Sequence, residues 1–213
     1  MPTTREAERL LDRLEEIYPE AECALVYESA WQLLVATILS AQCTDKRVNQ
    51  VTAVLFQQLS TPVEMAAANL DVVEELIHST GFYHNKAKHL IGCAQMLLDK
   101  HAGQVPPALG ELVALPGVGR KTANVVLGNI FDIPGMVVDT HVKRLSRRFG
   151  WTQKTNPVQI EKDLGTLLPP TRWTQCGHTL IEHGRACCKA PTPYCSQCPI
   201  VELCPRIGVD KSY

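Results

Sequence analysis

Four cysteines near the C-terminal end constrain the fold of this 213-residue chain more than any other feature. They follow the pattern Cys-x6-Cys-x2-Cys-x5-Cys. Thiolates at this density surround one compact centre and bind either zinc or a [4Fe–4S] cluster. Zinc sites usually contain two Cys-x2-Cys units, whereas this pattern has one, so the spacing favours the cluster. The predicted ligands are Cys188, Cys195, Cys198 and Cys204.

Five further cysteines complete the total of nine. Cys187 is adjacent to the first predicted ligand and is a competing candidate for the metal. The other four lie in apolar segments with helical periodicity and are predicted to be core residues. These four are Cys23, Cys43, Cys93 and Cys176.

The composition is that of a globular protein, since 45% of the residues are hydrophobic and 20% are charged. No run approaches the roughly 18 apolar residues of a membrane span, and the N-terminal residues contain no apolar export segment. We therefore expect a cytoplasmic, monomeric protein with no membrane partner, associated with the nucleoid if it is bacterial. The net charge is -1, so binding to nucleic acid requires a local basic patch.

Apolar residues recur with helical spacing along almost the whole chain, and no series of strand-like runs with hairpin turns occurs. Leu10 and Leu14, for example, fall on one face of segment 4–17. Ser29 and Thr44 precede the next two helical segments and are suitable N-caps. The sequence therefore predicts an all-α fold. Helices are expected over 4–17, 29–42, 45–59, 62–68, 71–79, 84–101, 108–114, 120–130, 139–149, 156–168 and 171–187.

Residues 109–131 are predicted to form a tight helix-hairpin-helix. A first helix stops at Pro116, Gly117 and Gly119 permit positive φ in the turn, and a second helix starts near Arg120. Glycines before a helix N-terminus leave backbone N–H groups uncovered, and the helix dipole adds to their attraction for an anion such as a DNA phosphate. The alternative is an ordinary helical hairpin that uses glycine only to turn.

Lys121 is expected in the first turn of this second helix, beside Arg120. A cation at a helix N-terminus and next to another cation has a lowered pKa, and a partly neutral lysine is a nucleophile capable of Schiff-base chemistry. The alternative is a solvated lysine on a helix surface.

Asp139 precedes another predicted helix, where it is either a simple N-cap or a charged carboxylate placed to stabilise a cation and move protons. His141 is predicted to be a hydrogen-bonded structural residue. A basic stripe on the same helix is the candidate for the local patch that the net charge lacks. The stripe consists of Lys143, Arg144, Arg147 and Arg148.

Taken in order with the cysteine pattern, four motifs make nearly the whole chain resemble the endonuclease III branch of the helix-hairpin-helix DNA glycosylases. The motifs are Leu39-Ser40-Ala41-Gln42-Cys43-Thr44-Asp45, Gly81-Phe82-Tyr83-His84-Asn85-Lys86-Ala87-Lys88, Leu115-Pro116-Gly117-Val118-Gly119-Arg120-Lys121-Thr122-Ala123 and Val138-Asp139-Thr140-His141.

The resemblance implies two helical domains that flank a DNA-binding cleft. A six-helix domain is expected over 22–132, with the helix-hairpin-helix at about 108–131, and an iron–sulfur cluster domain is expected from 1–21 together with 133–213. The resemblance also implies base excision repair, in which oxidised pyrimidines are removed from duplex DNA and the strand is cleaved at the abasic site. Double-stranded DNA with damaged pyrimidines or abasic sites is thus the expected partner.

The resemblance further implies roles for individual residues. Lys121 matches the family's nucleophile, and Asp139 matches its essential carboxylate. Gln42 matches the residue that fills the gap left by a flipped base, and Phe82 lies in the loop that wedges the opposite strand. The expected DNA contacts are Gln42, Phe82, Gly117, Gly119, Arg120, Lys143, Arg147 and Lys189.

Two features depart from the family pattern, namely the slightly negative net charge and a cluster loop in which Lys189 is the one basic residue. Both predict weaker nonspecific DNA affinity than in basic relatives. Two alternative functions also stand. One is a monofunctional glycosylase of the same superfamily, which has no lysine at the position of Lys121. The other is a non-catalytic DNA-binding module with structural zinc.

Overall fold

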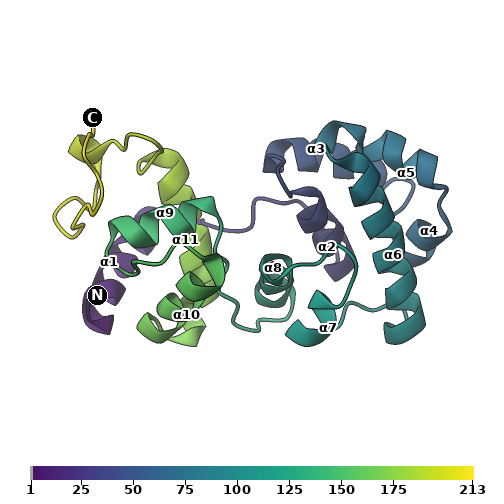
Figure 1. The fold of residues 1–213 in the computed structure, drawn as a ribbon, viewed down its shortest axis with the longest axis horizontal. Helices are drawn as coiled ribbons and strands as arrows, with labels where there is room; N and C mark the ends of the chain where they lie inside the picture. The colour runs from purple at the N-terminus through teal and green to yellow at the C-terminus, as the bar shows by residue number, and fades with distance from the viewer. Residues whose placement is uncertain (1) are drawn as a thin grey trace. The chain divides into compact units, whose positions relative to one another are not determined.

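The protein is described by a computed structural model that covers residues 2–213, and each regular element in this range is a helix (Figure 1). The predicted all-α fold is confirmed. The helices are α1 (Thr4–Ile17), α2 (Ala30–Leu39), α3 (Asp45–Leu55), α4 (Pro62–Ala67), α5 (Leu70–Ile77), α6 (Tyr83–His101), α7 (Leu109–Val113), α8 (Arg120–Ile130), α9 (Thr140–Arg148), α10 (Pro157–Leu167) and α11 (Trp173–Ala186), with short 3₁₀ turns η1 (His78–Thr80), η2 (Pro170–Arg172) and η3 (Cys195–Gln197).

The chain divides into two compact units, one formed by Cys23–Ile133 and the other by Met1–Glu22 together with Pro134–Tyr213. In the first unit, α2 is the central helix. Nine of its ten residues are buried, and it packs against α3, α6 and α8. A helix that is apolar on all sides is stable only inside a core, which explains why the sequence of α2 lacks an amphipathic pattern.

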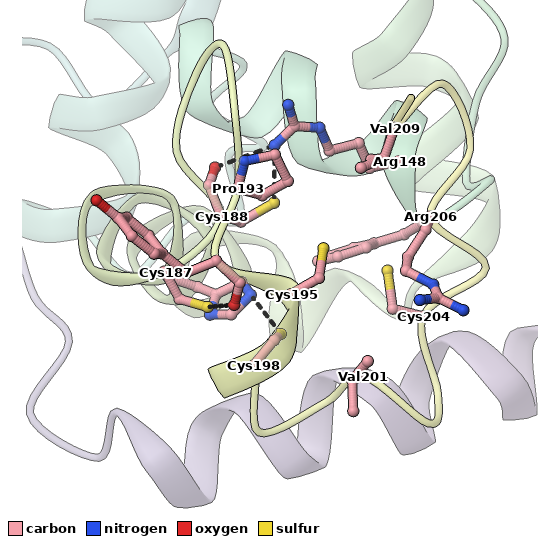
Figure 2. Close-up of a pocket in the computed structure, with 13 residues that line it drawn as sticks. Arg148, Cys187, Cys188, Pro193, Cys195, Cys198, Val201, Cys204, Arg206 and Val209 are labelled. Atoms are coloured by element: carbon pink, nitrogen blue, oxygen red, sulfur yellow. Dashed lines mark hydrogen bonds between the residues drawn. The ribbon is translucent and has the colours of Figure 1, made fainter. Parts of the chain in front are cut away.

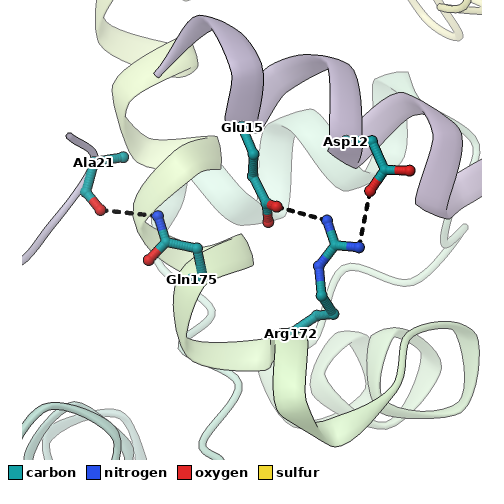
Figure 3. Close-up of polar contacts among 5 residues, drawn as sticks. All are labelled: Asp12, Glu15, Ala21, Arg172 and Gln175. Atoms are coloured by element: carbon teal, nitrogen blue, oxygen red, sulfur yellow. Dashed lines mark hydrogen bonds and ion pairs between the residues drawn. The ribbon is translucent and has the colours of Figure 1, made fainter. Parts of the chain in front are cut away.

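The second unit joins the N-terminal helix to the C-terminal part of the chain. Helix α1 contacts α11, and its leucines enter a core that includes Trp151. Figure 3 shows the polar contacts that hold α1 in place: Arg172 donates to Asp12 at 2.9 Å and to Glu15 at 2.7 Å. Gln175 donates to the carbonyl oxygen of Ala21 at 2.9 Å in the same region (Figure 3).

Several boundaries follow the N-cap signals in the sequence. The side chains of Ser29 and Thr44 cap α2 and α3 as predicted. Helix α2 ends at Leu39 rather than at 42, because the backbone of Gln42 is left-handed (φ 54°) and leaves the helix. Helix α3 likewise ends at Leu55 rather than at 59 and continues only as a turn.

The prediction for the scattered cysteines is correct for two residues and wrong for two. Cys93 and Cys176 are buried on helices, whereas Cys23 and Cys43 are only partly buried and lie in connecting segments. The buried neighbours of Cys43 belong to α2, and those of Cys23 are Ala21 and Leu25 in the connecting segment, so a hydrophobic context did not place either thiol inside. Among residues 2–213, no helix combines the length and the apolar character required to cross a bilayer.

Candidate active site and cysteine centre

The hairpin between α7 and α8 uses its two glycines differently. Gly117 has a φ of 76°, and a Cβ added there would lie 2.8 Å from the Cβ of His89 on α6. Gly119 has an ordinary extended backbone, and an added Cβ would meet no atom within 4 Å. Gly119 is also the N-cap of α8 and supplies no side-chain cap. Gly117 is therefore required by the fold, whereas Gly119 leaves a helix N-terminus open to an approaching group.

A matched pair of alanine substitutions separates these two roles. We expect Gly117→Ala to lower the free energy of unfolding by at least about 1–2 kcal/mol, because alanine resists the left-handed region and its Cβ meets His89. Gly119→Ala is expected to change the thermal unfolding midpoint little and to weaken DNA binding severalfold. The measurements are thermal unfolding and a DNA titration at fixed salt; wild-type affinity in Gly119→Ala contradicts a phosphate contact there.

Lys121 lies in the first turn of α8, where its side chain is exposed while Ala123 and Val126 on the opposite face are buried. Lys121 is accessible because it lies at the N-terminal end of α8, before the consecutive buried residues 123–127. Lys121 belongs to the unit of residues 23–133, and Asp139 belongs to the other unit.

Asp139 is the N-cap of α9, and its Oδ1 atom accepts a hydrogen bond of 2.8 Å from the backbone N–H of Val142. The cap uses one carboxylate oxygen and fixes the side-chain rotamer. Because a carboxylate has a second oxygen with further acceptor capacity, the same residue can cap the helix and act on a ligand. The structural and functional interpretations of Asp139 are therefore compatible.

The four residues of the basic stripe on α9 differ in their exposure and in their contacts. Arg148 is 8% exposed, and Arg144 is partly buried. Arg144 donates to the carbonyl oxygens of Gly184 and Cys188, and it contacts His141 at 3.1 Å, so His141 has the predicted structural hydrogen bond. The prediction of one continuous basic face is thus wrong. Arg147 is exposed and Lys143 partly exposed, so these two retain access to solvent.

Arg148 is directed into the loop that carries the first predicted metal ligand (Figure 2). Its guanidinium donates to the Sγ atom of Cys188 at 3.2 Å, to the carbonyl oxygen of Lys189 at 2.9 Å and to that of Pro191 at 3.1 Å. Charge-assisted bonds to several carbonyl oxygens order a loop that has no regular secondary structure of its own. The sequence did not reveal this role, because spacing alone does not show which face of α9 is covered.

All four predicted cysteine ligands line one pocket (Figure 2). No three of these sulfur atoms lie within 4.8 Å of one another among the described residues. Thiolates around a single tetrahedral zinc ion are about 3.8 Å apart, from Zn–S bonds of about 2.3 Å. The sulfur atoms of the four cysteines are therefore spaced for a group larger than one metal ion.

Cys187 belongs to a different arrangement. Its thiol donates to the carbonyl oxygen of Tyr194 at 3.4 Å (Figure 2), and with His183 and Cys198 it forms a group whose ligand atoms lie within 4.8 Å of one another. His183 is fully buried, and burial lowers its pKa to about 4, so the imidazole is neutral at pH 7. Its Nδ1 atom is 3.1 Å from the hydroxyl of Tyr18, and its Nε2 atom is 3.8 Å from the Sγ of Cys198. This trio is the one competing metal-binding group in the described part of the chain.

Gln42 and Phe82 share an unusual backbone conformation. Their φ angles are 54° and 51°, in the left-handed region that non-glycine residues rarely adopt. Phe82 is the N-cap of α6, where polar residues are preferred, yet its side chain is 65% exposed and makes no cap. Gln42 is exposed as well. Strained, exposed residues with no evident benefit to the fold are typical of functional sites.

Lys189 is exposed, and its ammonium lies 5.3 Å from the ring centroid of Tyr194. The ring of Tyr194 in turn stacks on Tyr213 at 5.2 Å. The exposed ammonium is therefore within cation–π distance of a ring that is itself packed against another ring.

Residues 35–170 match the HhH-GPD superfamily of base excision DNA repair proteins. Endonuclease III of Synechocystis is 50% identical over 93% of this chain and 91% of its own length. Endonuclease III of Bacillus subtilis is 43% identical over 96% and 94% of the two chains. The chain belongs to the endonuclease III family. The predicted family resemblance is thereby confirmed.

Solved structures of endonuclease III support the same assignment. A non-covalent endonuclease III–DNA complex and a trapped endonuclease III–DNA covalent intermediate each match with a TM-score of 0.92 and 42% identity, covering 97% of both chains. A thermostable thymine-DNA glycosylase with 18% identity and a TM-score of 0.84 shares the fold. The endonuclease III-family chain thus has a close structural relative that forms a covalent bond with DNA.

Proposed function

We propose that this endonuclease III-family chain is a bifunctional DNA glycosylase and abasic-site lyase that removes oxidised pyrimidines from duplex DNA. The observation that carries the proposal is the covalent endonuclease III–DNA intermediate, whose protein is 42% identical to this chain over 97% of its length. An exposed lysine in the first turn of α8 supplies an amine for such a bond.

In the proposed reaction, the Nζ atom of Lys121 bonds to C1′ while the glycosidic C–N bond breaks, and the leaving base takes the electron pair and a proton. Asp139 stabilises the positive charge that develops on the sugar and assists the proton transfers. The sugar ring then opens to an iminium ion. Loss of a C2′ proton breaks the C3′–O bond and releases the 3′ phosphate, after which water hydrolyses the imine and frees Lys121.

DNA binding is assigned to residues of both units. The glycines of the hairpin and Arg120 would hold one phosphate, and Lys143, Arg147 and Lys189 would contact the backbone. Gln42 would enter the space left by the extruded nucleotide, and Phe82 would separate bases of the opposite strand. Extrusion costs a few kcal/mol of stacking, and a damaged base lowers that cost.

The cysteine centre is proposed to hold a [4Fe–4S] cluster on Cys188, Cys195, Cys198 and Cys204. The wide spacing of the four thiols around one pocket supports a cluster rather than one zinc ion. When bound, the cluster supplies cross-links that order its loop, and the lysine chemistry above requires no electron transfer. Arg148 and Arg144 hold the same loop from α9.

Metal analysis tests this assignment. The purified protein is expected to contain about four irons per chain and to absorb in the visible range. Cys188→Ser is expected to lose most of the iron, whereas Cys187→Ser, which alters the adjacent thiol, is expected to keep it. Stoichiometric zinc, or iron loss on changing Cys187 with retention on changing Cys188, contradicts the assignment and favours the trio of His183, Cys187 and Cys198.

The catalytic proposal is tested by borohydride reduction during incubation with a thymine-glycol duplex. An imine between Lys121 and the sugar is reduced to a stable amine, so a protein–DNA adduct is expected on a denaturing gel. Base release without an adduct indicates a monofunctional glycosylase. Binding with neither base release nor an adduct indicates a non-catalytic module.

A further inference from the structure

A buried lysine on α6 links the two turns that carry Gln42 and Phe82. The side chain of Lys86 is 4% exposed, which is unusual for a lysine. Its Nζ atom donates to the carbonyl oxygen of Leu39 at 2.9 Å and to that of Thr80 at 2.9 Å. Thr80 is six residues before Lys86 and Leu39 is 47 residues before it, so one amine holds the end of α2 to the turn that precedes α6.

The first of these contacts fixes the end of α2. Leu39 is the last residue of the helix, where carbonyl groups lack helical partners, and an amine donor there is favoured by the helix dipole. The chain continues from Leu39 through one turn to the left-handed Gln42. A fixed Leu39 carbonyl therefore sets the starting point of the turn that presents Gln42.

The second contact fixes the turn before α6. Thr80 is the last residue of η1, and the two residues after it, Gly81 and Phe82, both have positive φ. The backbone N–H of Lys86 donates to the carbonyl oxygen of Phe82 at 3.1 Å, while its side chain holds Thr80. Lys86 thus binds the residue before Gly81 through its side chain and the residue after Gly81, Phe82, through its backbone N–H.

We propose that Lys86 is a positioning residue that couples the Gln42 turn to the Phe82 turn, so that both residues enter the DNA together. The proposal rests on the function proposed above for Gln42 and Phe82. Both acceptors are neutral carbonyl groups. Burial lowers the pKa of Lys86, but a neutral amine still has two N–H donors, so the coupling does not depend on protonation.

The coupling predicts a difference between duplex and single-stranded substrates. Filling a gap and separating the opposite strand are required only in duplex DNA, whereas attack of Lys121 on an abasic aldehyde is also possible on a single strand. Loss of the coupling should therefore slow lesion removal from duplex DNA and spare the lyase reaction on single-stranded abasic DNA. Damage to the whole unit would slow both.

The test compares Lys86→Met, which keeps the length of the side chain but cannot donate, with Lys88→Met, which removes the same charge from an exposed position on α6. We expect Lys86→Met to lower the single-turnover rate on a thymine-glycol duplex by about tenfold or more, since misplacement of a substrate-positioning group by about 1 Å can have such effects. The rate on single-stranded abasic DNA should match that of Lys88→Met. Equal losses on both substrates, or no loss on duplex, overturn the proposal.

Amide hydrogen exchange tests the coupling without any activity. In Lys86→Met, exchange should accelerate in residues 40–43 and 81–86 together, with α8 unchanged. Acceleration in one turn only, or in neither, overturns the coupling. If Lys86→Met does not fold, Lys86→Gln is used, because its amide nitrogen is one bond closer to the backbone than Nζ, and paired acceleration is again expected. Failure of the proposed function is distinct, because then Gln42→Ala and Phe82→Ala leave the duplex rate unchanged, or the wild type forms no product.

Discussion

Lys121→Gln is expected to abolish borohydride trapping and to lower the rate of cleavage at an abasic site by at least about a thousandfold, which corresponds to about 4 kcal/mol of lost transition-state stabilisation. Glutamine has a similar length and helix propensity, and position 121 is exposed, so the fold should be unaffected. The amide nitrogen, however, is not a nucleophile and cannot form an imine. Single-turnover cleavage of an abasic duplex at saturating enzyme is the measurement.

Lys121→Arg is the matched control for charge. The guanidinium stays protonated, so it preserves the attraction for DNA but does not attack C1′. We expect Lys121→Arg to bind the duplex nearly as tightly as the wild type and to form no adduct. A trapped adduct with either variant would show that another amine is the nucleophile and would remove Lys121 from the mechanism.

Asp139→Asn is expected to lower the glycosylase rate by about 10²–10⁴-fold, because a neutral amide cannot stabilise a cationic sugar or exchange protons. Asparagine is as good an N-cap as aspartate, so its side-chain oxygen can still accept from the backbone N–H of Val142. The free energy of unfolding should therefore change by less than about 1 kcal/mol. Asp139→Asn thus removes the proposed catalytic charge while it keeps the hydrogen bond that caps α9.

Asp139→Ala completes the comparison, since it removes both the charge and the cap. We expect it to be as inactive as Asp139→Asn and to lose about 1 kcal/mol more in stability, measured by denaturant unfolding. If Asp139→Asn retains at least half of the wild-type rate, Asp139 is a structural cap and the charge-stabilising group must be sought elsewhere.

Most helices of the fold could be predicted from the sequence, because the patterns that mark the start of a helix involve only neighbouring residues. Ser29, Thr44 and Asp139 were expected to begin helices and do so, since each carries a short polar side chain in front of an apolar repeat. The ends of helices were less predictable. The exit from α2 depends on the left-handed Gln42 and on a distant lysine that holds Leu39, and neither has a local signature.

Candidate site residues could be predicted from the sequence, but the contacts that distinguish their roles could not. Gly117 and Gly119 looked equivalent in the motif, and only the neighbouring His89 distinguishes the one that the fold needs. Arg148 looked like part of a DNA-binding stripe and instead holds the cysteine loop. In both cases the deciding contact comes from a residue far away in the sequence.

The composition of the second unit from Met1–Glu22 and Pro134–Tyr213 has a consequence for biosynthesis. Domains usually begin to fold as soon as their residues leave the ribosome. Residues 23–133 form a continuous stretch that can do so early, whereas α1, although made before them, must wait for α11 and Arg172. Until then, Leu10 and Leu14 remain exposed to solvent and to chaperones, so a segment synthesised before the first unit reaches its final place after that unit has folded.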